Sequence, residues 1–170
     1  MRLHLVDIDP RVVAALSHAF AGVSDVDVTC ADIVTVAHEA LVSPANSHGF
    51  MDGGVDQAYV AFFGADVERL VRERIARRPE GFLPVGAAEI VATGHARVPW
   101  LVVAPTMEMP EHVPAANAYR ALRASLRAVA RSGLAIADLH CPGLCTLVGG
   151  VAAQDAAAEM AQAYRDWRGA

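Results

Sequence analysis

The stretch from Ser43 to Gly64 constrains the fold more than any other part of the chain. It reads SPANSHGFMDGGVDQAYVAFFG. An apolar run that ends at Val42 precedes it, glycines occupy its centre, and an apolar-periodic segment begins at Val55. This order predicts a buried strand, a glycine-bearing loop and a helix start in immediate succession. Such loops present backbone N–H groups and a helix N-terminus at the carboxyl edge of a sheet, where phosphates bind.

Strands and helices alternate along the rest of the chain. The expected strands cover residues 3–7, 26–29, 41–43, 87–92, 100–104 and 135–140, and the expected helices cover 10–20, 56–63, 66–78, 117–131 and 151–167. Asp9 and Asp66 are the expected N-caps of the helices that they begin. The alternation predicts an α/β fold, a three-layer α/β/α sandwich around a mixed or parallel central sheet.

Composition and charge exclude several classes of protein. Hydrophobic residues make up 54% of the 170 residues and charged residues 19%, which argues for a substantial core and against disorder. A single domain over residues 1–170 is expected at this length. The net charge of −5 argues against a general nucleic-acid binder. No apolar run is long enough to span a bilayer, and the N-terminus predicts a strand and not a signal peptide.

The cysteines favour a reducing compartment. Cys30, Cys141 and Cys145 are an odd number at an uninformative spacing, so a cytoplasmic location is expected. His140 stands next to Cys141, but no second Cys/His pair completes a zinc-binding pattern. Cys141 and Cys145 are therefore expected to be small buried thiols, and no metal or cofactor is predicted.

A second glycine-bearing loop, Pro142 to Gly150, follows the strand expected at 135–140 and leads into the last helix. One such loop is weak evidence for a phosphate site, because structural turns explain most of them. Two loops, each between a strand and a helix, can converge at one edge of the sheet. They favour a diphosphate site without identifying the ligand.

These motifs resemble those of macro domains, a family whose members bind ADP-ribose. Ala31–Ile33 is similar to the adenine-contacting element of that family, and Ser43–Asn46 to its asparagine-ending strand exit. Gly53–Asp56 resembles the first diphosphate loop with the acid that follows it. Pro142–Gly150 stands in the place of the second phosphate loop, with its proline, threonine and closing glycine in register. The stretch SPANSHGFMDGGVD is similar, more narrowly, to a compact branch common in bacteria and phages.

The resemblance implies a contact for each motif. Asp32 would accept a hydrogen bond from the adenine amino group beside the backbone of Ile33, and Asn46 would bind hydroxyls of the distal ribose. The diphosphate-binding loop residues would be Gly53, Gly54, Val55, Cys145, Thr146, Leu147, Val148, Gly149 and Gly150. Two alternatives stay open: Asp32 as an exposed helix N-cap, and Asn46 as a turn residue bonded to its own backbone.

The resemblance places Asp56 at the reaction centre. In hydrolytic members of the family the acid at this position orients or activates water near the anomeric carbon of the distal ribose. The implied activity is removal of ADP-ribose from proteins, by cleavage of an ester at glutamate or aspartate, with Asn46 positioning the ribose. The partner would be ADP-ribose or an ADP-ribosylated protein. The alternatives are a module that binds ADP-ribose without turning it over, a scaffold without ligand and, for Asp56, a mere helix cap.

Three positions of the second loop depart from the family pattern. Leu147 stands where glycine is usual, so its backbone would be strained if its φ were positive, and its side chain could crowd the groove. Cys145 replaces a small residue. Gly149 stands where many relatives place an aromatic near the distal ribose, and Phe50 and Phe63 are the candidates to substitute for it.

Overall fold

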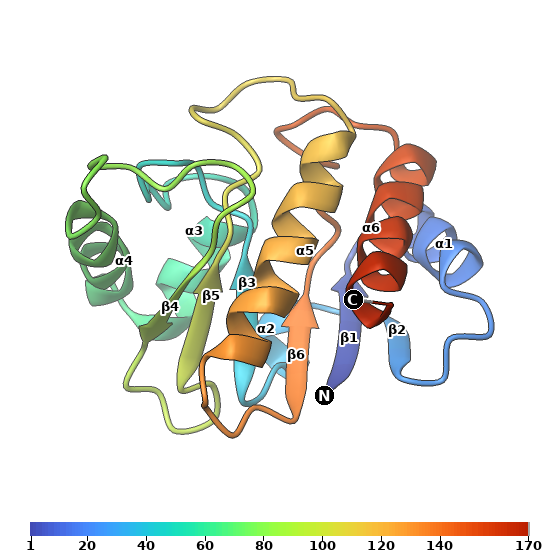
Figure 1. Ribbon diagram of the computed structural model, residues 1–170, viewed down its shortest axis with the longest axis horizontal. Helices are drawn as coiled ribbons and strands as arrows, with labels where there is room; N and C mark the ends of the chain where they lie inside the picture. Colours follow the sequence, from blue (N-terminus) through green and yellow to red (C-terminus); the bar gives the residue numbers. More distant parts are fainter. Residues whose placement is uncertain (170) are drawn as a thin grey trace.

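The computed structural model describes residues 1–169, and its sheet is mixed. The strands are β1 (Arg2–Asp7), β2 (Val26–Cys30), β3 (Ala40–Ser43), β4 (Glu89–Ala92), β5 (Trp100–Val103) and β6 (Asp138–Cys141). They lie in the order β2-β1-β6-β3-β5-β4 (Figure 1). Neighbouring strands are parallel, except that β4 runs antiparallel to β5 at one edge.

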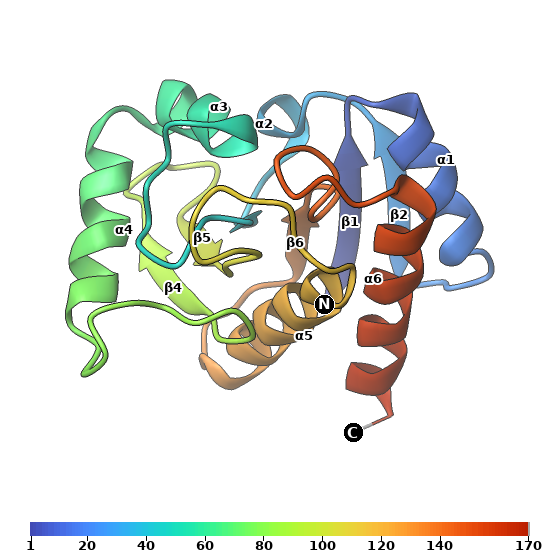
Figure 2. The same ribbon diagram turned by 90° about the horizontal axis from the view of Figure 1, so that it is seen from above.

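Helices cover both faces of this sheet. They are α1 (Pro10–Ala19), α2 (Ile33–Val36), α3 (Gly54–Phe63), α4 (Asp66–Ala76), α5 (Ala116–Arg131) and α6 (Ala153–Arg168). α1, α5 and α6 pack on one face, and α2, α3 and α4 lie on the other (Figures 1 and 2). The three-layer α/β/α prediction is confirmed. Among the described helices, none combines the length and apolarity that a bilayer crossing requires.

Two apolar clusters, one on each face of the sheet, hold the layers together. Leu3 of β1 and Leu122 of α5 belong to the first, and Leu41 of β3, Leu101 of β5 and Tyr59 of α3 belong to the second. All five side chains are fully buried. Both faces of a central strand in this sheet are covered by helices, so neither face favours polar side chains. This explains why the sequence of β5 is a continuous apolar run.

Of the two N-caps predicted from the sequence, the structure confirms one and not the other. Asp9 caps α1, because its carboxylate accepts a hydrogen bond from the Arg11 N–H at 2.8 Å, and Pro10 follows at the first helical position. The prediction that Asp66 caps α4 is wrong. Ala65 is the N-cap, and Asp66 lies inside the first turn, where its charge still favours the helix dipole.

The last strand begins later than predicted. Residues 135–137 do not join β6, because the Ala137 N–H is bonded to the Glu39 carboxylate at 2.6 Å. The Ile136 N–H is bonded locally to the Leu134 carbonyl at 2.9 Å. The Glu39 side chain, from a distant part of the chain, therefore accepts the backbone N–H that would otherwise bond to a neighbouring strand. The sequence around residue 137 gives no sign of this contact.

Candidate functional site

A cleft of about 560 Å³ opens at the carboxyl ends of β1, β3 and β6. The expected ligand-binding residues that line it are Asp32, Ile33, Asn46, Gly53, Gly54, Val55, Asp56, Cys145, Thr146, Leu147, Val148 and Gly149. They come together because β3 and β6 are adjacent parallel strands, so the loops that follow them leave the same edge of the sheet. Two distant stretches of sequence thus form facing walls of one cleft.

The first loop delivers the N-terminus of α3 to the cleft. Gly53 is the N-cap, and it has no side chain that could accept a capping hydrogen bond. Gly54 has a φ of 60°, in the left-handed region that favours glycine. The first N–H groups of a helix have no intrahelical acceptor, so these remain available to an anion, which the helix dipole also favours.

The second loop, residues 142–150, closes on itself. The Gly150 N–H donates to the Leu147 carbonyl at 3.1 Å, and the Val151 N–H donates to the Cys145 carbonyl at 3.0 Å. Gly150 departs from the expectation of a phosphate donor, because its N–H is already used and it lies outside the cleft lining. Its φ of 68° makes it a turn residue.

The strain considered for Leu147 falls on Cys145 instead. Cys145 has a φ of 65°, whereas Leu147 is not among the residues with positive φ. A left-handed residue other than glycine costs about 1–2 kcal/mol. Leu147 is 73% exposed, and its Cδ2 lies 3.8 Å from where a Cβ on Gly54 would be. Its side chain therefore spans the mouth of the cleft between the two loops.

Asp56 lies in the first turn of α3 and is only 6% exposed. The Ser43 hydroxyl, at the end of β3, donates a hydrogen bond to Asp56 Oδ1 at 2.6 Å. Burial raises the pKa of Asp56 to about 7, and the hydrogen bond from Ser43 offsets part of that effect. A carboxyl with this pKa gains and loses its proton near neutral pH, as a general base must.

Asp56 does not cap α3, because the N-cap of this helix is Gly53. Within the described residues, the hydrogen bond to its carboxylate comes from Ser43 and not from a helix N–H. Ser43 was not singled out from the sequence as a site residue. The available signal was a single polar residue at the end of an otherwise apolar buried strand.

Asp7 is a second residue that the sequence analysis missed. It ends β1, lines the cleft, and accepts hydrogen bonds from the Asp9 N–H at 2.9 Å and from the Gly143 N–H at 3.1 Å. It therefore ties the exit of β1 to the start of the second loop.

Comparison with known proteins identifies the family. The model of the macro domain family matches residues 42–160. The chain belongs to the macro domain family. An uncharacterised protein of Aquifex aeolicus is 33% identical over 147 residues, which cover 83% of this chain and 81% of that protein.

Solved macro domain structures share the fold. The Oceanobacillus iheyensis macrodomain with ADP has a TM-score of 0.68 at 20% identity, over 80% of this chain and 72% of that one. Thermosipho africanus DarTG in complex with ADP-ribose has a TM-score of 0.57 at 18% identity, over 70% of this chain and 33% of that one.

In this macro domain Asn46 is engaged by its own loop. Its side-chain oxygen accepts hydrogen bonds from the His48 N–H at 3.1 Å and the Phe50 N–H at 3.2 Å. Its amide nitrogen donates to the Phe50 carbonyl at 2.8 Å. The turn role left open for Asn46 is therefore present. The amide carries a second N–H, and the residue lines the cleft.

Asp32 likewise has the structural role that was left open. It is exposed and caps α2, a short helix that the sequence analysis did not predict, by accepting a hydrogen bond from the Val34 N–H at 3.1 Å. Asp32 and Ile33 both line the cleft. A carboxylate accepts several hydrogen bonds, so capping leaves Asp32 with acceptor capacity.

The position of Gly149 has no room for the aromatic that relatives carry. A Cβ there would lie 2.7 Å from the Cys145 carbonyl oxygen, which real structures do not tolerate. Phe50 lines the cleft and is 37% exposed, with the Arg72 guanidinium 4.6 Å from its ring centroid. Phe63 packs with the second apolar cluster instead, so Phe50 is the aromatic at this site.

The expectation for the two cysteines near the second loop is confirmed. Cys141 and Cys145 are buried and free. Burial raises the pKa of the Cys145 thiol to about 11 and that of Cys141 further. Neither thiol is a nucleophile at neutral pH, because only the thiolate attacks.

Proposed function

We propose that this macro domain binds ADP-ribose and releases it from proteins by hydrolysing an ester to a glutamate or aspartate side chain. The observation that carries the proposal is the buried Asp56 carboxyl, bonded to Ser43, between two loops that converge on one cleft. The fold shared with structures that contain ADP and ADP-ribose supports the ligand class.

The cleft suggests a pose for the ligand. In this pose the adenine binds beside Asp32 and Ile33, and the diphosphate binds between the N-terminus of α3 and the second loop, all of which line the cleft. The distal ribose would then lie beside Asn46 and Asp56. Phe50 would flank it from the first loop.

The proposed reaction uses water and one carboxylate. Asp56 accepts a proton from a water molecule while the oxygen of that water attacks the anomeric carbon of the distal ribose. The bond from that carbon to the substrate carboxyl breaks, and the electron pair leaves on the carboxylate. A carboxylate is a stable leaving group, so no general acid is needed. The Ser43 hydrogen bond orients Asp56 and leaves Oδ2 for the water.

The test is release of ADP-ribose from a protein mono-ADP-ribosylated at glutamate, followed by mass spectrometry. The same protein modified at serine or arginine is the comparison, because those linkages have poorer leaving groups. We expect rapid release from the glutamate ester and at least about 100-fold slower release from the other two. If calorimetry detects binding of ADP-ribose but no substrate releases it, the proposed hydrolase activity is wrong.

A reader module that binds ADP-ribose without cleaving it is the second candidate. Two observations favour it. The Asn46 amide is already bonded within its loop, and Leu147 crosses the mouth of the cleft. Binding without release in the experiment above would establish this alternative.

Replacing Leu147 by alanine is expected to tighten ADP-ribose binding about 3- to 10-fold, or about 0.6–1.4 kcal/mol. The side chain approaches Gly54 where the diphosphate would enter, so its removal widens the mouth of the cleft. Calorimetry on both proteins measures the effect. Val36→Ala is the control, since Val36 is also an exposed apolar residue but lies outside the cleft lining. Equal or weaker binding by Leu147→Ala would show that Leu147 does not obstruct the ligand.

A further inference from the structure

Three histidines from separate parts of the chain meet on or beside three adjacent strands, and none of them lines the cleft. His4 of β1 and His140 of β6 are register partners, and His38 lies just before β3. One ring nitrogen of each lies within 4.8 Å of the others. The strand order β1-β6-β3 places them side by side on the sheet face that carries α2.

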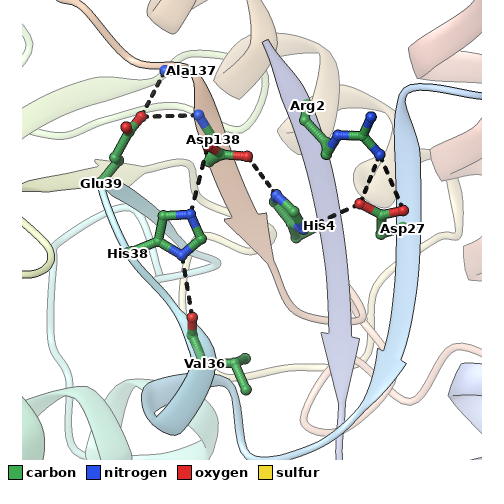
Figure 3. A network of polar contacts seen from close by, with 8 residues as sticks. All are labelled: Arg2, His4, Asp27, Val36, His38, Glu39, Ala137 and Asp138. Carbon is green, nitrogen blue, oxygen red and sulfur yellow. Dashed lines mark hydrogen bonds and ion pairs between the residues drawn. The ribbon is translucent and has the colours of Figure 1, made fainter.

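Hydrogen-bonding groups orient His4 and His38 in the same sense (Figure 3). Their Nδ1 atoms face outward, His4 to Asp27 Oδ2 at 3.6 Å and His38 to the Val36 carbonyl at 3.4 Å. Their Nε2 atoms both face Asp138, at 2.6 Å for His4 and 3.5 Å for His38. In metal-binding histidines the outer nitrogen typically donates to a carboxylate or a backbone carbonyl, and groups of these two kinds face the Nδ1 atoms of His4 and His38.

His140 contributes an unpaired nitrogen. It is 2% exposed, and its Nδ1 is buried without a hydrogen-bond partner among the described residues. Its ring stacks on that of His4 with centroids 4.5 Å apart and lies edge-on to His38 at 4.6 Å. A neutral imidazole keeps a lone pair on one ring nitrogen, which a metal ion can accept. A buried polar atom without a partner costs free energy, which a cation in the cluster would recover.

Glu39 anchors the segment that carries His38. It has a φ of 56°, and its carboxylate accepts hydrogen bonds from the Ala137 N–H at 2.6 Å and the Asp138 N–H at 3.0 Å (Figure 3). A left-handed backbone at a residue other than glycine persists only where its surroundings hold it. The clamp therefore holds His38 beside β6.

We propose that His4, His38 and His140 bind a divalent transition-metal ion of the Zn²⁺ class, with Asp138 as the neighbouring carboxylate. Imidazole suits Zn²⁺, Ni²⁺ and Cu²⁺, whereas Mg²⁺ and Ca²⁺ take oxygen ligands. The three ring nitrogens lie within 4.8 Å of one another, and the nitrogens on one tetrahedral zinc ion are closer than that, so binding draws the rings together. The bound ion takes the place of the proton in the hydrogen bond between His4 Nε2 and Asp138 Oδ1. No step of the proposed hydrolysis uses this site.

The experiment titrates tag-free protein with Zn²⁺ by calorimetry, and with Co²⁺ by visible absorption as a probe of ligand geometry. All proteins carry Cys30→Ser, because Cys30 is an exposed thiol that could bind metal by itself. We expect one ion per chain and the ligand-field absorption of four-coordinate Co²⁺. His38→Ala should weaken Zn²⁺ binding at least about 100-fold, and Asp27→Asn, which removes an outer partner of His4, about 10-fold.

His18→Ala is the matched control, since His18 is exposed on α1, and it should bind Zn²⁺ like the parent. Circular dichroism and thermal unfolding check that each variant is folded. Absence of saturable binding by the parent protein, or equal affinity for the parent and His38→Ala, would overturn the proposal. The cluster would then be an ion-pair network held together by protons.

Discussion

Asp56→Asn is expected to slow the release of ADP-ribose from a glutamate-linked substrate by about 10²–10⁴-fold, the range that a positioned general base contributes. Asparagine has nearly the same shape and can still accept the Ser43 hydrogen bond, but it cannot take a proton from water. The affinity for ADP-ribose should change by less than about threefold, because the diphosphate and adenine contacts are untouched. Single-turnover rates and calorimetry measure the two effects separately.

The control for that experiment is Asp52→Asn, which removes an exposed carboxylate from the same loop. It should leave the rate within a small factor of the wild-type value. The wild-type rate should rise with pH through about 7 and level off above it, since only the deprotonated form of Asp56 is a base. If Asp56→Asn released ADP-ribose at the wild-type rate, Asp56 would not be the general base.

The same substitution is expected to stabilise the fold at pH 8. The pKa of Asp56 rises from 3.8 to about 7 on folding, mainly through burial, so the native state binds a proton that the unfolded chain has lost. The stability that Asp56 contributes is therefore full below about pH 4 and falls as pH rises to about 7. The whole difference corresponds to about 4 kcal/mol. Asparagine is not subject to this loss, so its melting temperature at pH 8 should be higher by on the order of 10 °C.

Thermal and urea unfolding at pH 4 and pH 8 test this expectation. The advantage of Asp56→Asn should be large at pH 8 and nearly absent at pH 4, where both side chains are neutral. Asp52→Asn makes the same chemical change at an exposed position of the same loop and is the control. An equal difference at both pH values would mean that Asp56 ionises like a surface acid.

The sequence was sufficient for the fold and for the place of the cleft, because both follow from local patterns. The strand–loop–helix order around Gly53 and Gly54 required a helix N-terminus at a sheet edge, and that is where α3 begins. The proposed role of Asp56 came from the resemblance of Gly53–Asp56 to the first loop of macro domains. Its partner Ser43 was not identified from the sequence, because the contact between Asp56 and Ser43 depends on how α3 packs over the end of β3.

Side chains that replace backbone partners were beyond local prediction. The carboxylate of Glu39 shortens β6 by taking the Ala137 N–H, and nothing near residue 137 indicates it. The left-handed residue other than glycine in the second loop is Cys145 and not Leu147, since the position of the turn depends on which carbonyls accept the Gly150 and Val151 N–H groups. The three histidines have no common motif because each comes from a different strand region.

The mouth of the cleft is apolar, and this has a thermodynamic consequence. Ile8 and Leu147 are 74% and 73% exposed, and Val148 and Phe50 add further apolar surface to the same cleft. A ligand that covers these side chains returns their hydration water to the bulk, which gives binding a negative heat-capacity change. The enthalpy of association therefore becomes more favourable on warming while its entropy becomes less so. The heat of binding measured at a single temperature therefore includes a contribution from burial of the apolar side chains at the mouth as well as from polar contacts deeper in the cleft.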